Sequence, residues 1–373
     1  MKYYIIAGEA SGDLHASNLM KELKKLDHSA DFRCWGGDLM KAQGAVLVKH
    51  YRELAFMGFI EVIINIKTIF SNLKLCKKDI LQYKPDALIL VDYPGFNLRI
   101  AEFAKAAGIK VFYYISPQIW AWKQGRVHKI KKTVGKMFVI LPFERDFYKR
   151  FNYDVEFVGH PLLDAINDPW YKNEISSFRK DEGLSEKPLI AILPGSRKQE
   201  ISKVLPLMLA NVSKFPGYEF VIAGVSSLPE DFYSEICAGH ENVKIVIGKT
   251  YILLSNVVAA IVTSGTATLE TALFNVPEVV CYKGSAISFF LAKKLVKVKY
   301  ISLVNLIMDD EVVKELIQQD FNSAQLQQEL SKILDPGVAD KIKLQFAQLK
   351  LKLGGSGASA KTAYLIMKEL KSQ

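Results

Sequence analysis

The chain alternates short apolar runs with stretches of helical spacing, and the whole pattern occurs twice. In the first half, runs typical of strands covered on both faces lie at 3–7, 87–91, 111–115, 137–141 and 155–158. Helical stretches separate most of these runs, as at about 14–26. Strands that alternate with helices predict a parallel sheet with helices on both of its faces.

The pattern stops at a charged, loop-like segment that contains Asp168-Pro169, and then restarts. Further strand-like runs lie at 189–193, 220–223, 243–247, 258–262 and 279–281. We therefore expect an α/β protein with two doubly wound, Rossmann-like domains, at 1–166 and 167–343. In such a pair the active site is expected in the cleft between the carboxyl ends of both sheets.

Residues 344–373 are expected to form a third, helical segment. After the flexible break Gly354-Gly355-Ser356-Gly357, helical spacing is kept by Ala360, Ala363, Tyr364, Met367 and Leu370. This helix should dock on the first domain or on a partner subunit.

One stretch of the first half is apolar around most of a helix. Apart from Lys67, its polar residues form one narrow stripe, made by Glu61, Asn65, Thr68 and Asn72. The apolar arc is wider than a core-facing helix needs. This helix is either buried deep in the first domain or exposed to a membrane or to acyl chains. In the second interpretation the contacts come from Met57, Phe59, Ile60, Ile63, Ile66 and Phe70.

Net charge indicates the kind of partner, and the cysteines indicate the redox compartment. The formal net charge of +10 favours an anionic partner, which is nucleic acid, anionic lipid or a phosphorylated substrate. The four cysteines form no CxxC pair, which favours a reducing compartment and argues against a structural metal. The first residues do not resemble a signal peptide, and no apolar run reaches the roughly 20 residues that span a bilayer.

Two groups of basic residues offer places for an anionic partner. An aromatic stretch at 113–123 is followed by Arg126, Lys129, Lys131, Lys132 and Lys136, and the second group is Lys293, Lys294, Lys297 and Lys299. Both groups near an apolar helix suit an anionic membrane surface, although each is also typical of a solvated face. The aromatic stretch either lines an acceptor pocket or packs in the core.

The stretch 259–273, A-A-I-V-T-S-G-T-A-T-L-E-T-A-L, joins a buried strand to a helix through a turn of small residues. The backbone N–H groups at the start of that helix favour an anion such as phosphate. Glu270 follows four residues after the turn, where its carboxylate could reach the hydroxyls of a sugar. The alternative is an ordinary connection in which Ser264 or Thr266 caps the helix.

A second turn of this kind is L-P-G-S-R at 193–197. Gly195 and Ser196 allow close approach to the backbone, and the planar fork of Arg197 suits phosphate. In the first half, Gly8 and Gly12 match neither the Rossmann nor the Walker spacing, and they indicate a turn that a ligand or a neighbouring loop approaches closely.

Asp92 stands at the carboxyl end of the buried strand 88–91. Partial burial beside Tyr93 and Phe96 would raise its pKa and make it a better base. The alternative is that Asp92 only caps the helix that starts near Phe96. The sequence contains neither HExxH nor GxSxG, and no His/Cys spacing typical of a metal site.

Six motifs in order resemble one family. They are G-E-A-S-G-D at 8–13, V-D-Y-P-G-F-N at 91–97, S-P-Q-I-W-A-W-K at 116–123, L-P-G-S-R at 193–197, S-G-T-A-T-L-E at 264–270 and S-L-V-N-L-I at 302–307. The chain resembles the lipid-A-disaccharide synthases, inverting glycosyltransferases of the GT-B fold. The resemblance implies transfer from UDP-2,3-diacylglucosamine to 2,3-diacylglucosamine 1-phosphate (lipid X), with the β-1,6 disaccharide and UDP as products.

The resemblance also implies roles for individual residues. Asp92 is the expected general base. The expected donor-site residues are Ser11, Gly12, Gly195, Ser196, Arg197, Ser264, Gly265, Thr266, Glu270 and Asn305. No D-x-D pair lies near the donor motifs, which is consistent with a reaction that needs neither a metal nor a cofactor.

The family resemblance implies a peripheral protein on the cytoplasmic face of the bacterial inner membrane, and a homodimer that exchanges C-terminal segments. Nucleic acid is not an expected partner. Two alternatives stay open from the sequence. One is a UDP-GlcNAc epimerase or another UDP-sugar transferase of the same fold, and the other is a non-catalytic membrane-surface protein that binds nucleotide-sugars.

Overall fold

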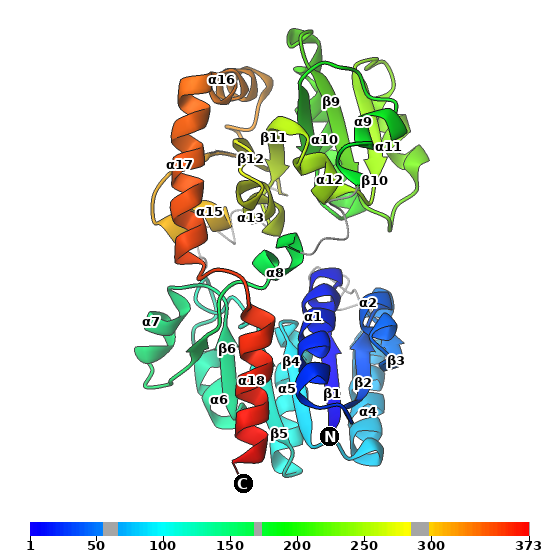
Figure 1. Ribbon diagram of the computed structural model, residues 1–373, viewed down its shortest axis with the longest axis vertical. Coiled ribbons are helices and arrows are strands. Elements are labelled where there is room, and N and C mark those ends of the chain that lie inside the picture. Colours follow the sequence, from blue (N-terminus) through cyan, green and yellow to red (C-terminus); the bar gives the residue numbers. More distant parts are fainter. Residues whose placement is uncertain (55–65, 168–173, 285–297, 373) are drawn as a thin grey trace. The chain divides into compact units, whose positions relative to one another are not determined.

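The computed structural model describes residues 1–54, 66–167, 174–284 and 298–372 (Figure 1). The chain divides into two compact units. Unit 1 comprises Met1–Asn167 together with Leu353–Gln373, and unit 2 comprises Asp168–Lys352. Each unit contains one parallel sheet of its own.

The sheet of unit 1 has seven strands in the order β3-β2-β1-β4-β5-β6-β7. Their bounds are β1 Lys2–Ala7, β2 Asp31–Gly36, β3 Val46–His50, β4 Ala87–Val91, β5 Lys110–Tyr114, β6 Lys136–Val139 and β7 Glu156–Phe157. The chain builds outward from β1 to β3 and then returns to place β4 on the other side of β1. The carboxyl ends of β1 and β4 therefore form the switch point of a doubly wound sheet, where ligands of such folds bind.

The helices of unit 1 connect these strands (Figure 1). They are α1 Ala10–Leu26, α2 Asp38–Ala42, α4 Ile66–Tyr83, α5 Pro94–Ala106, α6 Arg126–Thr133, α7 Glu144–Lys149, α8 Leu162–Asn167 and α18 Ala358–Lys371, with a short 3₁₀ turn, η1, at Tyr51–Glu53.

The C-terminal helix α18 packs against α1 of the same chain (Figure 1, red and blue). The Asp164 carboxylate accepts hydrogen bonds from the backbone N–H groups of Gly357 at 2.5 Å and Ser359 at 2.8 Å, where α18 begins. Further along, the Tyr3 hydroxyl donates to the sulfur of Met367 at 3.0 Å. These contacts attach the end of the chain to β1, α1 and α8.

The sheet of unit 2 has six strands in the order β10-β9-β8-β11-β12-β13. Their bounds are β8 Leu189–Leu193, β9 Glu219–Gly224, β10 Val243–Ile247, β11 Val257–Thr263, β12 Glu278–Tyr282 and β13 Lys314–Ile317. As in unit 1, the strand order changes direction once, and β8 and β11 are the neighbouring strands on either side of this switch point.

The helices of unit 2 are α9 Phe178–Asp181, α10 Lys198–Leu209, α11 Glu230–Cys237, α12 Thr250–Leu254, α13 Thr266–Leu273, α15 Leu303–Met308, α16 Ser323–Ile333 and α17 Pro336–Lys352, with a 3₁₀ turn, η3, at Val212–Lys214. Helix α17 continues through residue 344, where the sequence predicts the C-terminal segment to start, and ends at Lys352. Gly354 and Gly355, both at positive φ, follow and redirect the chain toward α18.

Apolar strands form the centre of both sheets. Every residue of β4 and of β8 is buried, as the runs of aliphatic residues predict for parallel strands covered on both faces. One buried residue departs from this pattern. The Glu278 carboxyl group, at the start of β12, is fully buried, and neither of its oxygen atoms has a hydrogen-bond partner among the residues that the structure describes. Burial raises its pKa well above the usual value, so the group stays protonated in the folded chain.

Glu278 predicts a loss of stability as the pH rises. In the unfolded chain the carboxyl group loses its proton above about pH 4.5, whereas the folded chain keeps it, so unfolding becomes easier by up to about 1.4 kcal/mol per pH unit. Glu278→Gln removes this dependence. Its stability relative to the parent chain should rise between pH 5 and pH 8, as measured by denaturant unfolding.

The matched control is Glu235→Gln, which changes an exposed glutamate on α11. This variant should follow the pH dependence of the parent chain. If the free energy of unfolding changed with pH in the same way in Glu278→Gln and in the parent chain, Glu278 would not be a buried group with a raised pKa.

Candidate functional site

Asp92 begins the connection between β4 and α5, and its backbone is held from three sides. Its N–H donates to the carbonyl of Tyr114 at 3.3 Å, and its carbonyl accepts from the Asn97 side-chain amide at 2.8 Å and the Tyr113 hydroxyl at 2.5 Å. Asp92 and Tyr93 both have positive φ, at 42° and 47°, which costs a non-glycine residue about 1–3 kcal/mol. The surrounding hydrogen bonds hold this strained turn in place.

The environment of Asp92 favours the protonated carboxyl group. Burial and, to a smaller extent, the negative charge of Glu9 raise its pKa from 3.8 to about 7, against the opposing effect of a hydrogen bond from the Tyr93 backbone. Glu9 follows β1, the strand beside β4, so the two carboxyl groups stand on neighbouring connections at one edge of the sheet. A carboxyl group with a pKa near 7 exchanges protons readily at neutral pH, as a general base must. The alternative that Asp92 caps α5 is wrong, because Tyr93 occupies the cap position and, among the described residues, no side-chain hydrogen bond caps this helix.

The G-E-A-S-G-D turn after β1 is shaped by close packing. A Cβ atom on Gly8 would lie 2.3 Å from the ring of Tyr93, so the close approach that the glycine permits is made by the neighbouring loop. Ser11 is exposed and Gly12 is buried in the first turn of α1. Both belong to unit 1, whereas the other predicted donor-site residues belong to unit 2.

Asp13 completes the same motif and has a structural role. Its carboxylate accepts hydrogen bonds from the backbone N–H groups of Gly37, Leu39 and Met40 at 2.8–3.1 Å, which holds the start of α2.

In unit 2, the two predicted donor turns follow adjacent strands. The turn at Gly195–Arg197 follows β8, and the turn at Ser264–Thr266 follows β11, its neighbour across the switch point. Because the strands are parallel, both turns lie at the carboxyl edge of the sheet. The structure therefore brings the two halves of the predicted donor site together.

The first donor turn has a carboxylate folded over it. Gly195 has a φ of 104°, and a Cβ atom there would lie 2.5 Å from an oxygen of Glu200. Burial raises the pKa of Glu200, and the charge of Arg197 opposes that rise. Arg197 itself is exposed and precedes α10.

The second donor turn leaves the start of α13 without a side-chain cap. Gly265 occupies the cap position, and no side-chain hydrogen bond from the described residues caps the helix. The alternative that Ser264 or Thr266 caps this helix is therefore wrong. Ser264 instead donates its hydroxyl to the carbonyl of Ile301 at 3.1 Å. The open helix start is suited to an anion. Four residues on, burial raises the pKa of Glu270 to about 7.

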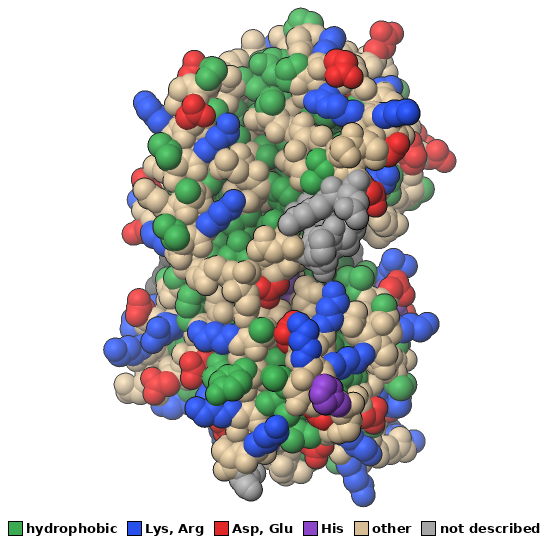
Figure 2. Space-filling model, in the orientation of Figure 1, with side chains coloured by type: hydrophobic (Ala, Val, Ile, Leu, Met, Phe, Trp, Pro, Cys, Tyr) green, Lys and Arg blue, Asp and Glu red, His purple; other side chains and the backbone are tan. Residues whose placement is uncertain are grey.

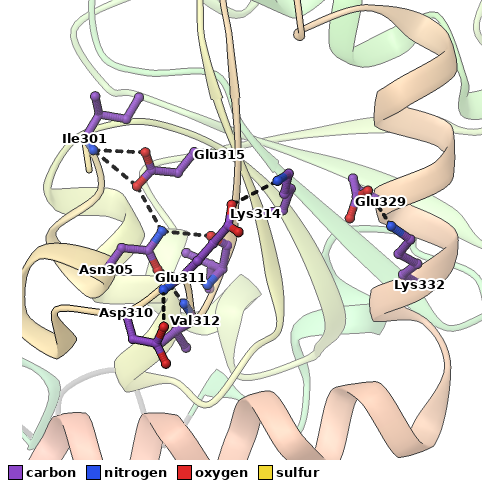
Figure 3. A network of polar contacts seen from close by, with 10 residues as sticks. Ile301, Asn305, Asp310, Glu311, Val312, Lys314, Glu315, Glu329 and Lys332 are labelled. Atoms are coloured by element: carbon purple, nitrogen blue, oxygen red, sulfur yellow. Dashed lines mark hydrogen bonds and ion pairs between the residues drawn. The ribbon is translucent and has the colours of Figure 1, made fainter. Parts of the chain in front are cut away.

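Asn305 lies on α15, which packs against α13, and its side chain points toward Glu315 and Val312 (Figure 3). Its side chain is fully buried, and its amide group donates to the carbonyl of Val313 at 2.8 Å and to Glu315 at 2.9 Å. Its side-chain oxygen accepts the N–H groups of Val312 at 2.9 Å and Val313 at 3.0 Å. Both the amide group and the oxygen of the Asn305 side chain are thus hydrogen-bonded within unit 2. This geometry gives Asn305 a role in holding the donor turn.

Glu315 is the centre of this network, and sequence reasoning missed it. Its carboxylate accepts from the N–H group of Ile301 at 2.9 Å and from the Asn305 side chain (Figure 3), and also from the N–H group of Ser302 at 2.9 Å. Ile301 is the residue whose carbonyl holds Ser264. No sequence motif contains Glu315. Asn97 and Tyr113 on the Asp92 side were also missed, although each stands inside or beside a motif.

The predicted apolar contact surface is only partly within the described residues. Met57, Phe59, Ile60 and Ile63 lie outside them. Ile66 and Phe70, in the first turns of α4, are 49% and 62% exposed. No helix in the described part of the chain is long and apolar enough to cross a membrane.

On the face in Figure 2, lysine and arginine side chains of the described residues are spread over both units rather than gathered into one band. Within the same described ranges, no group of three or more His, Cys, Asp or Glu residues could hold a metal ion.

Comparison with known proteins decides the family. A sequence model of the lipid-A-disaccharide synthetase family matches residues 3–368. The lipid-A-disaccharide synthase of Geobacter metallireducens is 37% identical over 373 residues, which is 98% of this chain and 96% of that protein. The chain belongs to the lipid-A-disaccharide synthetase family. The predicted resemblance is confirmed, and the chain is a glycosyltransferase of lipid A synthesis.

Solved structures show how far the fold is shared. The UDP-GlcNAc 2-epimerase of Neisseria meningitidis, bound to UDP-GlcNAc, has a TM-score of 0.71 at 12% identity, over 99% of this chain and 100% of that one. The glycosyltransferase of kitacinnamycin has a TM-score of 0.67 at 13% identity, over 99% of both chains. At these identities the likeness concerns the fold alone. It confirms the predicted GT-B class of two doubly wound units, while family membership does not favour the epimerase alternative.

The Glu315 network yields a stability prediction. Glu315→Gln replaces one accepting oxygen with an N–H₂ group that faces backbone donors, so we expect a loss of roughly 2 kcal/mol in the free energy of unfolding. The backbone amides of Ile301 and Ser302 should also exchange hydrogen faster. Denaturant unfolding and hydrogen exchange measure the two effects.

The control is Glu311→Gln, which breaks only an exposed pair with Lys314 and should change stability by less than about 0.5 kcal/mol. Equal effects of the two substitutions would remove Glu315 from the centre of the network.

Proposed function

We propose that the chain transfers 2,3-diacylglucosamine from UDP to the 6-hydroxyl of 2,3-diacylglucosamine 1-phosphate, with Asp92 as the general base. The proposal is supported by family membership and by one observation above all. Asp92 is a half-buried residue at the switch point of the unit 1 sheet, and the pKa of its carboxyl group is raised to about 7. In this position a parallel-sheet enzyme carries functional groups.

The proposed step is an inverting displacement. The acceptor hydroxyl oxygen attacks C1 of the donor sugar while the bond from C1 to the UDP oxygen breaks. Asp92 takes the hydroxyl proton, so the nucleophile gains electron density as the new bond forms. The rigid backbone of Asp92, bonded to Asn97 and Tyr113, limits the freedom of the carboxylate and so favours a productive geometry.

Unit 2 is proposed to hold the leaving group. UDP gains negative charge as the glycosidic bond breaks, and fixed positive groups at that position stabilise the transition state. The uncapped start of α13 offers backbone N–H groups for the diphosphate, and Arg197 offers its guanidinium. We propose that the Glu270 carboxyl group binds the hydroxyl groups of the donor sugar. Asn305 belongs to the donor site as a positioning residue, and Ser11 and Gly12 remain proposed contacts from unit 1.

Two further expectations concern the surroundings of the enzyme. We propose that it binds peripherally to an anionic membrane on the cytoplasmic face, since exposed Ile66 and Phe70 continue the apolar stretch of the sequence. Flotation with anionic vesicles tests this, and a chain that stays with the soluble fraction contradicts it. A homodimer that exchanges α18 also stays a prediction, which the mass of the protein in solution tests.

Replacement of the proposed base should abolish turnover without affecting donor binding. Incubation with UDP-2,3-diacylglucosamine and lipid X should yield UDP and the disaccharide by mass spectrometry. Asp92→Asn should lower turnover by roughly 100-fold or more and leave UDP affinity nearly unchanged. Near-normal turnover would remove Asp92 from this role, and absence of the disaccharide with the parent chain would contradict the function.

The pH dependence of the parent enzyme follows from the same group. Only the deprotonated carboxylate accepts a proton, and the pKa of Asp92 is about 7. The rate constant kcat/KM should therefore rise about tenfold per pH unit below pH 7 and level off above it. A flat profile between pH 5.5 and 7 would contradict the assignment.

Arg197→Ala should weaken binding of UDP by about 10- to 100-fold, because charge-assisted hydrogen bonds contribute about 1.5–3 kcal/mol. Isothermal titration calorimetry measures the affinity. The control is Arg179→Ala, since Arg179 donates to the carbonyls of Ser185 and Lys187 away from the donor turns. Unchanged affinity in Arg197→Ala would exclude this contact.

A further inference from the structure

The loop at 115–125, between β5 and α6, has a rigid base. Ile119 and Trp120 are buried, and the Trp120 ring packs edge-on against Phe143 with ring centroids 4.9 Å apart. The Ser116 and Tyr148 hydroxyls share a hydrogen bond of 2.7 Å. The loop is thus anchored to unit 1 from beneath, and its outward side chains are displayed from a fixed backbone.

The outward face carries one aromatic ring and two cations. Trp122 is 48% exposed. The Lys123 ammonium lies 4.0 Å from the centre of a Trp122 ring, and the Arg126 guanidinium lies 5.9 Å from it. Within residues 1–54, 66–167, 174–284 and 298–372, neither cation forms an ion pair with an acidic side chain.

The two cations are held together at an energetic cost. Partial burial lowers the pKa of Lys123, and the positive charge of Arg126 lowers it further. An anion placed between them would relieve this repulsion. Two convergent cations beside an amphipathic indole ring suit a phosphate group attached to a lipid, because the ring favours the boundary between apolar and aqueous surroundings.

This group stands on the same edge of the sheet as the proposed base. Strand β5 is the neighbour of β4, and Tyr114 pairs with Val91, the residue before Asp92. The Tyr113 hydroxyl, which bonds to the Asp92 carbonyl, has its pKa raised by the charge of Asp92 and lowered by that of Arg126, after the larger effect of burial. Both charges therefore act on one hydroxyl group.

We propose that Lys123 and Arg126, beside Trp122, bind the phosphate of the acceptor lipid and so select a phosphorylated acceptor. The inference rests on the proposed function and adds to it the residues that distinguish lipid X from the same diacylglucosamine without phosphate. Arg126 supplies a planar pair of donors, Lys123 a mobile point charge, and Trp122 the apolar border of the site.

The test compares two acceptors, 2,3-diacylglucosamine with and without its 1-phosphate. Arg126→Gln and Lys123→Gln should each lower kcat/KM for the phosphorylated acceptor by about 10- to 100-fold. With the acceptor that lacks phosphate, the change should stay within about twofold, since no contact is lost. UDP affinity should be unchanged in both variants.

A binding measurement keeps the test independent of turnover. In detergent micelles without donor, calorimetry should show that the parent chain prefers the phosphorylated acceptor and that Arg126→Gln loses this preference. Equal affinity of the parent chain for both acceptors would overturn the inference while leaving the proposed function intact. Failure of the parent chain to form disaccharide from lipid X would instead contradict the proposed function.

The matched control is Arg150→Gln, because Arg150 also lies over an aromatic ring, 5.2 Å from the centre of Phe147. This substitution should leave kcat/KM unchanged with either acceptor. A phospholipid head group is the competing source of phosphate. If Arg126→Gln weakens binding to anionic vesicles and lowers activity equally with both acceptors, the cations serve the membrane and the inference is wrong.

Discussion

The direction change in each parallel sheet is the constraint on which the rest of the structure depends. A strand added on the opposite side of the first one leaves two carboxyl ends adjacent, with their connections on opposite faces. In unit 1 these ends carry the Gly8–Asp13 turn and Asp92, and in unit 2 they carry Gly195–Arg197 and Ser264–Thr266. The order of the strands thereby brings segments that are far apart in the sequence to one edge of each sheet, 79 residues apart from Asp13 to Asp92 and 69 from Gly195 to Ser264.

Burial then sets the chemistry of these edges. The same removal of water that stabilises the strands raises the pKa values of Asp92 and Glu270 to about 7. A solvated aspartate would be too weak a base to assist a sugar hydroxyl at neutral pH. In the proposed reaction, the enzyme obtains a usable base by placing a carboxyl group where the core meets solvent and by fixing its backbone with Asn97 and Tyr113.

Much of the fold was predictable, because central strands are almost wholly apolar. The runs at 87–91 and 189–193 coincide with β4 and β8. Strands β2, β3 and β13 were not predicted, since β3 is half-exposed and both β2 and β13 carry charged residues, which mask the strand pattern. For the site, the turns were recognisable from glycine and hydroxyl residues. The role of Asn305 was not, because it depends on Glu315, which only the folded β13 brings near.

The attachment of α18 to α1 makes unit 1 discontinuous in sequence, with unit 2 inserted between its parts. During synthesis, residues 1–167 emerge first, yet the surface of α1 that receives α18 stays uncovered until residues 358–371 have left the ribosome. The contact between Tyr3 and Met367 spans 364 positions. Closing so long a loop is slow compared with local helix formation. The last contacts of unit 1 therefore form only after the whole of unit 2 has been synthesised, and until then the face of α1 that receives α18 stays exposed.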